Sequence, residues 1–131
     1  MKVLALDYGS ARTGIAVSDP TGTLARPAGV VERAGTDAGL RRLVEIVREE
    51  EPELIVVGLP LTLRGEHGAQ AQETERFADS LRAAVGLPVE LFDERFTTAL
   101  AAKTPSASSE DARAAAHLLT SFLEWASARR D

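Results

Sequence analysis

Short apolar runs alternate with longer amphipathic segments along this chain. Near the start, Lys2–Leu6 and Gly14–Ser18 are rich in β-forming residues and are joined by a loop that contains Gly9. Two such runs separated by a short glycine-containing loop predict an antiparallel hairpin. Arg26–Val31 has the same character, so the first third of the chain is expected to form three strands.

The middle of the chain combines a helical period with a continuous apolar run. The segment from Thr36 to Glu50 predicts a helix, with Thr36 or Asp37 as its N-cap and Pro52 just beyond its end. Glu53–Gly58, "ELIVVG", is typical of a strand that is covered on both faces, which indicates a central parallel strand. The apolar positions of the helix are Leu40, Leu43, Ile46 and Val47.

The second half repeats this alternation. Gln70–Val85 predicts a helix that ends at Gly86, and Leu87–Phe92 predicts a further short strand. Phe96–Lys103 is expected to form a short helix and Glu110–Arg129 a longer one. The longer helix has an apolar stripe: Ala114, Ala115, Leu118, Leu119, Phe122 and Trp125.

This order of elements predicts an α/β fold. Three antiparallel strands followed by two right-handed crossover units give one mixed five-stranded sheet with helices on both faces. The 131 residues are in the size range of one domain, so residues 1–131 are expected to fold as a single unit. Ligands of open α/β sheets collect at the carboxyl ends of the parallel strands, where candidate chemistry should be sought.

Composition narrows the chemistry. The chain has no cysteine, which excludes disulfides, zinc–thiolate sites and thiol nucleophiles. The first apolar run meets Asp7 too early for a signal peptide, and no apolar run approaches ~20 residues, so we expect a cytoplasmic protein without a membrane partner. With 20 acidic and 15 basic residues, the net charge of −5 disfavours a broad nucleic-acid-coating surface, though not a nuclease with an acidic metal site.

Acidic residues follow the predicted strands at three distant points of the chain. Asp7 ends the first strand within "LALDYGSARTGIAVSD", Asp93 and Glu94 follow the last strand, and Asp111 begins the last helix. If these positions meet at one sheet edge, their carboxylates repel each other unless a hard cation joins them. Mg²⁺ or Mn²⁺ takes such oxygen ligands, and a pair of these ions supports phosphodiester hydrolysis.

Each acidic position also has a purely structural explanation. Asp7 could cap the following turn by accepting hydrogen bonds from its backbone. The acidic pair at 93–94 could form a solvated turn with an ion pair to Arg95, and Asp111 could favour the positive end of the last helix by ~0.3–1 kcal/mol. The residues alone leave both explanations open.

Four motifs in order, "LALDYGSARTGIAVSD", "IVVGLPL", "LFDERFTT" and "DARAAAHLL", span nearly the whole chain. Together they resemble the YqgF/RuvX family of RuvC-like, RNase H-fold nucleases. The resemblance implies an RNase H-like sheet and metal-dependent cleavage of Holliday junctions or of the 5′ end of precursor 16S rRNA. It also implies that Asp7, Glu94 and Asp111 are the catalytic metal ligands, with Asp93 as the alternative to Glu94.

The chain departs from this pattern at two places. RuvC relatives carry a glutamate at the end of the fourth strand, where this chain has Gly58, so the second ligand must come from the "DER" segment. The interval before Asp111 is short and contains "KTPSASSE" where the family tends to have a basic loop. The grip on phosphate, and hence the preference between junction DNA and rRNA, stays open; the RuvC-like resemblance slightly favours branched DNA.

Strand alternation distinguishes the two acidic neighbours, because Asp93 and Glu94 point to opposite sides of a regular strand. We expect Glu94 to face Asp7, since its longer side chain reaches further toward the middle of the sheet.

Candidate phosphate contacts surround the first loop and the later turns. The backbone N–H groups of Gly9 and Ser10 and the forked guanidinium of Arg12 could bind a phosphate beside Asp7. Arg64 and Arg95 are further expected contacts. The alternative is a plain hairpin turn with a solvated arginine.

Two other classes of protein compete with the nuclease. One is a non-catalytic RNase H-fold module that binds structured RNA or a protein partner. The other is an ATP-binding fold of the actin or sugar-kinase type, which requires a second lobe for which 131 residues leave no room.

Resolving a junction needs two symmetric nicks and hence a homodimer, whereas trimming one RNA end needs a single site.

Overall fold

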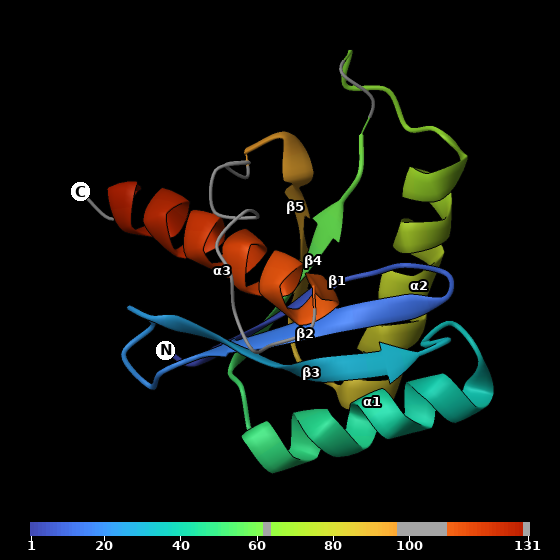
Figure 1. The fold of residues 1–131 in the computed structure, drawn as a ribbon, viewed down its shortest axis with the longest axis horizontal. Coiled ribbons are helices and arrows are strands. Elements are labelled where there is room, and N and C mark those ends of the chain that lie inside the picture. The colour runs from blue at the N-terminus through green and yellow to red at the C-terminus, as the bar shows by residue number, and fades with distance from the viewer. Residues whose placement is uncertain (62–63, 97–109, 130–131) are drawn as a thin grey trace.

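Every strand in the described part of the chain belongs to one sheet (Figure 1). The computed structural model describes residues 1–61, 64–96 and 110–129. The five strands lie in the order β3-β2-β1-β4-β5. Their bounds are β1 Val3–Asp7, β2 Arg12–Ser18, β3 Ala25–Glu32, β4 Leu54–Leu59 and β5 Val89–Asp93.

The sheet is mixed, as the sequence predicts. β1 and β2 form the antiparallel hairpin, with Asp7 opposite Gly14, and β3 pairs antiparallel with β2. β1, β4 and β5 run parallel, with Gly58 of β4 opposite Phe92 of β5. The carboxyl ends of β1, β4 and β5 therefore lie together at one edge of the sheet.

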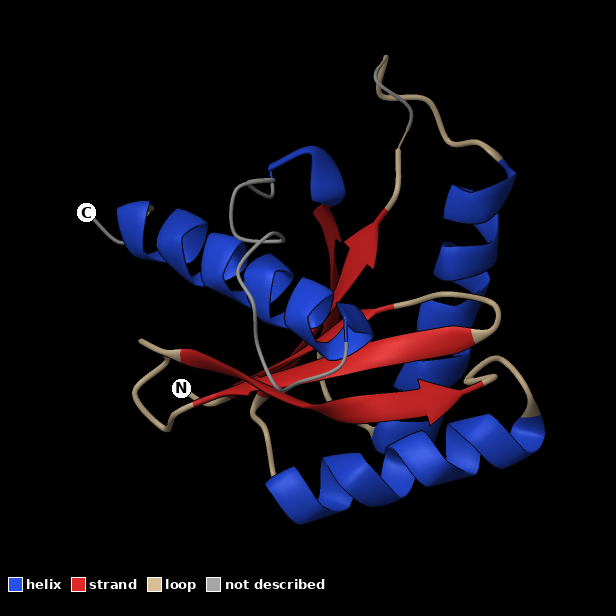
Figure 2. Ribbon diagram, viewed as in Figure 1, coloured by secondary structure: helices blue, strands red, loops and turns tan. Residues whose placement is uncertain are grey.

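Helices cover both faces of the sheet. α1 (Asp37–Glu50) begins at Thr36, whose hydroxyl accepts a hydrogen bond from the Gly39 N–H at 3.1 Å, as an N-cap does. α2 (Ala69–Val85) ends at Gly86, which adopts the left-handed conformation. η1 (Glu94–Phe96) is a short 3₁₀ helix after β5, and α3 (Glu110–Ala128) is the last helix. In Figure 2, α3 crosses the near face while α2 passes behind the sheet.

Side chains of each strand alternate between the two cores. Leu4 and Leu6 of β1 pack with α1 and α2, whereas Val3 and Ala5 pack in the second core with α3. Phe92 of β5 belongs to the α3 side. Because this alternation fixes the face of each position, it places Asp7 on the α3 side of the sheet.

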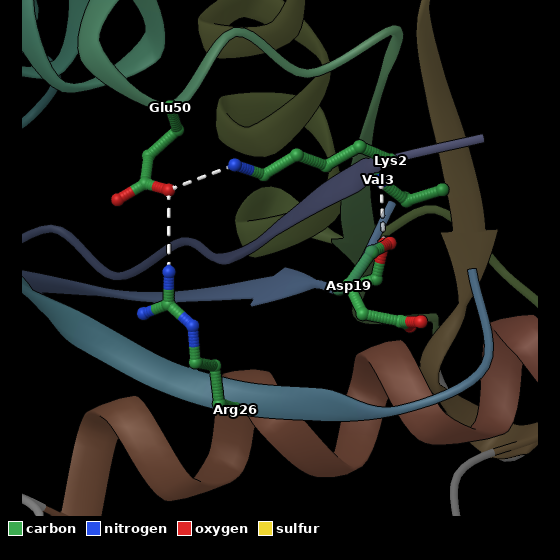
Figure 3. A network of polar contacts seen from close by, with 6 residues as sticks. Lys2, Val3, Asp19, Arg26 and Glu50 are labelled. Carbon is green, nitrogen blue, oxygen red and sulfur yellow. Dashed lines mark hydrogen bonds and ion pairs between the residues drawn. The ribbon is translucent and has the colours of Figure 1, made fainter. Parts of the chain in front are cut away.

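Polar contacts hold the amino end of β1, remote from the carboxyl edge (Figure 3). Glu50 of α1 accepts hydrogen bonds from Lys2 Nζ at 3.2 Å and from Arg26 Nη2 at 3.4 Å. Ser18 Oγ accepts from the Val3 N–H at 2.8 Å. Asp19 caps the β2–β3 turn, and its bonds from Thr21 and the backbone hold the pKa of its carboxyl well below the usual range. The Glu50 contacts thus tie β3 and the residue before β1 to α1, and the Ser18 contact ties β1 to the end of β2.

One predicted helix falls largely outside the described residues. Of the segment Phe96–Lys103, the structure describes only Phe96, as the end of η1.

Among the described residues, no helix has the length and apolarity that crossing a bilayer requires.

Candidate active site

Asp7 and Glu94 meet at the carboxyl edge of the sheet. Asp7 is the last residue of β1, and Glu94 is the first residue of η1, directly after β5. The two carboxyl groups are joined by a hydrogen bond. Both side chains are partly buried, so this contact lies at the boundary between the α3 core and solvent.

The environment of this pair favours a bound proton. Burial raises the pKa of Asp7, the hydrogen bond from Glu94 lowers it, and the negative charge of Asp111 raises it. Burial, the hydrogen bond to Asp7 and the charges of Asp7 and Asp93 raise the pKa of Glu94 to about 7. Near neutral pH the protonated Glu94 therefore donates to the ionised Asp7 carboxylate, and the pair carries less than its full negative charge.

Asp111 approaches the pair from α3. A Cβ on Gly14, the strand partner of Asp7, would lie 1.9 Å from the Asp111 backbone oxygen, so the first turn of α3 rests directly on β2 at this point. The Asp111 carboxylate accepts a hydrogen bond from Arg12 Nε at 2.9 Å. This ion pair joins residues that are distant in sequence and orients Asp111 toward the start of β2.

Asp93 has a different partner. Its carboxylate accepts from the Arg95 side chain, with Nε–Oδ2 at 2.9 Å and Nη2–Oδ2 at 2.6 Å, and from the Arg95 backbone N–H. The hydrogen bonds from Arg95 lower the pKa of Asp93. The turn ion pair considered from the sequence thus forms at Asp93, while Glu94 faces Asp7.

The predicted phosphate contacts are partly engaged within the protein. Ser10 Oγ donates to Glu73 Oε2 at 2.7 Å, Arg12 bonds Asp111, and Arg95 bonds Asp93. Gly9 forms the β1–β2 turn, where its N–H lies 3.5 Å from Thr13 Oγ1. Arg64 is exposed on the segment before α2. A phosphate that binds Arg12 or Arg95 therefore competes with a carboxylate for the donors already in use.

Glu73 is a site-supporting residue that the sequence reasoning missed. From α2, its Oε2 accepts hydrogen bonds from Ser10 Oγ and from the Tyr8 hydroxyl at 2.8 Å. Tyr8 in turn stacks on Phe77, with ring centroids 4.4 Å apart. Glu73 thereby ties the turn after Asp7 to α2, and no local pattern in the sequence links it to that turn.

A family comparison identifies the relatives of this chain. The sequence profile described as "RuvX: Holliday junction resolvase" matches residues 1–125. The chain belongs to the RuvX family. The resemblance seen in the four sequence motifs is thereby confirmed.

Named relatives in the RuvX family differ in how much of their length matches. A protein of Chloroflexus aurantiacus (strain J-10-fl) is 43% identical over 99 residues, which cover 76% of this chain but only 65% of the relative. A protein of Syntrophomonas wolfei is 35% identical over 140 residues, covering 100% of this chain and 99% of the relative. Both carry the name "Putative pre-16S rRNA nuclease".

Solved structures define the fold of this RuvX chain. Thermus thermophilus RuvC in complex with a Holliday junction substrate superimposes with a TM-score of 0.67 at 17% identity, covering 98% of this chain and 97% of RuvC. The fowlpox virus Holliday junction resolvase superimposes with a TM-score of 0.59 at 11% identity, covering 95% and 99%. The fold is therefore RNase H-like and matches that of RuvC.

The acidic residues at the sheet edge of this RuvX chain are of the ligand type that hard divalent cations prefer. Asp7 and Glu94 offer carboxylate oxygens, the donors that Mg²⁺ and Mn²⁺ prefer, and their raised pKa values reflect burial without a positive charge beside them. Within the described ranges, however, no three acidic or histidine residues already form a group that could hold a metal ion. The Asp111 carboxylate is turned toward Arg12 through Oδ2, so a three-carboxylate set requires it to shift toward Asp7.

Proposed function

We propose that this RuvX-family chain is a divalent-metal-dependent nuclease that hydrolyses phosphodiester bonds. The observation that carries the proposal is the contact between Asp7 and Glu94, two partly buried acidic groups from separate strands at the carboxyl edge of the sheet. At neutral pH, burying two carboxyl groups side by side costs stability, because burial disfavours their charged forms. A bound divalent cation would offset this cost, because it favours the charged carboxylates and takes their oxygens as ligands.

The chain's own residues have distinct roles in this reaction. Asp7 and Glu94 would hold Mg²⁺ or Mn²⁺, and Asp111 would join them after shifting toward Asp7. When bound, such ions would supply positive charge that stabilises the attacking and leaving oxygens of a phosphodiester. The guanidinium of Arg12 has the planar fork that matches a phosphate. Glu73 keeps the turn between Asp7 and Arg12 in place.

For the substrate, we favour the 5′ end of precursor 16S rRNA. The relatives that cover this chain carry the name of a pre-16S rRNA nuclease. The second candidate is a Holliday junction, which the description of the family profile supports. RNA trimming needs one active site per event, whereas junction resolution needs two sites related by symmetry.

The decisive experiment measures Mn²⁺-dependent cleavage of a labelled pre-rRNA leader and of a labelled four-way junction. We expect the wild type to cut the leader faster than the junction and EDTA to stop the reaction. Asp7→Asn should abolish cleavage while the circular dichroism spectrum stays unchanged. Its stability should equal or slightly exceed that of the wild type, because a partly buried negative charge near Asp111 is removed.

Asp79→Asn is the matched control, because Asp79 is exposed on α2 and pairs only with nearby Arg82 in the described contacts. It should cleave at the wild-type rate. Undiminished turnover of Asp7→Asn, or turnover in EDTA, would contradict the metal-dependent mechanism. Tight RNA binding without any cleavage would instead support the non-catalytic module.

A further inference from the structure

Glu94 can reach Asp7 only by crossing a strand. β4 lies between β1 and β5, so the Glu94 side chain passes over the carboxyl end of β4 on the α3 side. The residue below it is Gly58, whose strand partner is Phe92. A Cβ on Gly58 would lie 2.7 Å from Glu94 Oε1 and 3.0 Å from Glu94 Cγ. The path of the carboxylate therefore occupies the space that a side chain at position 58 would fill.

Backbone conformation does not account for this glycine. The described glycines with positive φ are Gly22, Gly29, Gly65 and Gly86, and Gly58 is not among them. Position 58 lies inside β4, where a side chain normally adds packing and glycine weakens the strand. A glycine in such a place marks the close approach of another group, and here that group is the Glu94 carboxyl.

We propose that Gly58 is a positioning residue that admits Glu94 to the metal site. A Cβ at position 58 requires the Glu94 carboxyl to move from its present place beside Asp7. The inference rests on the proposed metal-dependent nuclease and adds that the site takes its second carboxylate from η1 because β4 leaves the space empty.

If Gly58 makes room for the Glu94 carboxylate, a carboxylate placed at position 58 should be able to replace it. A role in packing alone gives no such expectation. The Cβ position of residue 58 is 2.7 Å from Glu94 Oε1, and the carboxylate oxygens of an aspartate lie two bonds beyond its Cβ. An aspartate at position 58 would therefore present its oxygens in the region that Glu94 now supplies. With Glu94 truncated to alanine, the carboxylate could come from β4 instead.

A packing explanation would involve Leu118 of α3. Its Cδ2 would lie 3.1 Å from a Cβ at position 58, but it is the end of a flexible side chain that can move by a few tenths of an ångström. That contact is the same whether residue 94 is glutamate or alanine. The identity of residue 94 therefore separates the two roles.

The first test compares the wild type with Gly58→Ala by crystal structure without metal and by Mn²⁺ titration followed by electron paramagnetic resonance. We expect the Glu94 carboxyl to leave Asp7 and the Mn²⁺ dissociation constant to rise at least tenfold. A Glu94 carboxyl that still bonds Asp7, or an unchanged dissociation constant, would overturn the proposal. If Gly58→Ala does not fold alone, Gly58→Ala with Glu94→Ala should fold; failure of both would assign Gly58 to packing and equally overturn it.

The second test is a transfer of the carboxylate. Glu94→Ala should lose Mn²⁺ binding, and Gly58→Asp with Glu94→Ala should recover it to within tenfold of the wild type. The matched control, Gly58→Asn with Glu94→Ala, has the same shape without the charge and should not recover it. Recovery by asparagine as well as aspartate, or by neither, would contradict the proposal.

Failure of the proposed function gives a different result. A wild type that neither binds Mn²⁺ nor cleaves nucleic acid would refute the nuclease, whereas the position of Glu94 in metal-free Gly58→Ala crystals would still decide the role of Gly58.

Discussion

Individual acidic residues at the carboxyl edge differ in what offsets their charge. Glu94 and Asp7 share a proton, Asp111 bonds Arg12, and Asp93 bonds Arg95 through several hydrogen bonds. A divalent cation that binds at Asp7 must therefore displace the proton on Glu94, which costs little near neutral pH. It has no comparable reason to open the Asp93–Arg95 contact.

Mn²⁺ titration of paired variants tests this difference between neighbours. Glu94→Gln should weaken Mn²⁺ binding at least tenfold, because it removes an anionic oxygen beside Asp7. Asp93→Asn should leave the affinity within about threefold of the wild type and is the matched control. A larger loss in Asp93→Asn than in Glu94→Gln would reverse the assignment of the second ligand.

The shared proton also predicts how stability depends on pH in EDTA. The pKa of Glu94 is raised from 4.5 to about 7, so over this range the folded chain binds a proton that the unfolded chain has lost. The stabilising contribution of this proton is fully present below pH ~4.5 and is lost as pH rises through about 7. Asp93, whose pKa is lowered from 3.8, acts below this window and with the opposite sign.

Urea denaturation at pH 4.5, 6 and 8 should therefore show Glu94→Gln gaining stability relative to the wild type as pH rises. A constant difference between the two proteins across this range would mean that Glu94 has an ordinary pKa.

Among the elements, the position of α3 depends on how closely its first turn can approach β2. The Asp111 backbone oxygen would lie 1.9 Å from a Cβ on Gly14, and the Ala112 nitrogen 3.1 Å from it. Both neighbours are backbone atoms, which cannot rotate away as a side chain can. The absence of a side chain at Gly14 thus fixes where α3 begins and, with it, how near Asp111 comes to Asp7.

Gly14→Ala should push the first turn of α3 away from β2. The overpacking is expected to lower the free energy of unfolding by ~1–3 kcal/mol, measured by urea denaturation. Mn²⁺ affinity should fall as well, because Asp111 moves with the helix. Wild-type stability and Mn²⁺ affinity in this variant would show that α3 is not held by contact at Gly14.

At the scale of the whole molecule, the charge balance limits the grip on nucleic acid. The net charge is −5, and two of the arginines at the carboxyl edge, Arg12 and Arg95, form ion pairs with Asp111 and Asp93. The other cations expected to contact a polyanion are Arg64, Arg113 and Lys103, of which Lys103 lies outside the described residues. Few contacts imply modest affinity.

Binding of a single-stranded leader should fall with salt with a slope of log K against log salt no steeper than about −3 to −4, for ~5 phosphate contacts. Fluorescence anisotropy across a salt series measures this slope. A much steeper slope would mean that a larger basic surface takes part. Under the RNA proposal, light scattering should show a monomer; a stable dimer that nicks opposing junction strands in pairs would favour the resolvase instead.

The sequence by itself determined the elements and the edge of the sheet at which the candidate acidic residues lie. Periodicity, caps and turn residues predict the order of strands and helices, and the ends shift by at most a few residues, as at Ala25–Glu32 for the predicted Arg26–Val31. These signals are local, so they can be recognised without the fold. Alternation shows from the sequence only that Asp93 and Glu94 point to opposite sides, whereas the contact of Glu94 with Asp7 comes from the structure.

Only the tertiary structure decided which partner each site residue has. Arg12 bonds Asp111 across 99 residues, and Ser10 bonds Glu73 across 63, contacts that no local pattern indicates. The sequence also does not show why positions 14 and 58 are glycine. The absence of a side chain matters there only because another part of the chain packs against the backbone at each position. Such contacts depend on how distant elements pack and on which rotamer each side chain then adopts, which is why the sequence located the carboxylates but not the groups that hold them.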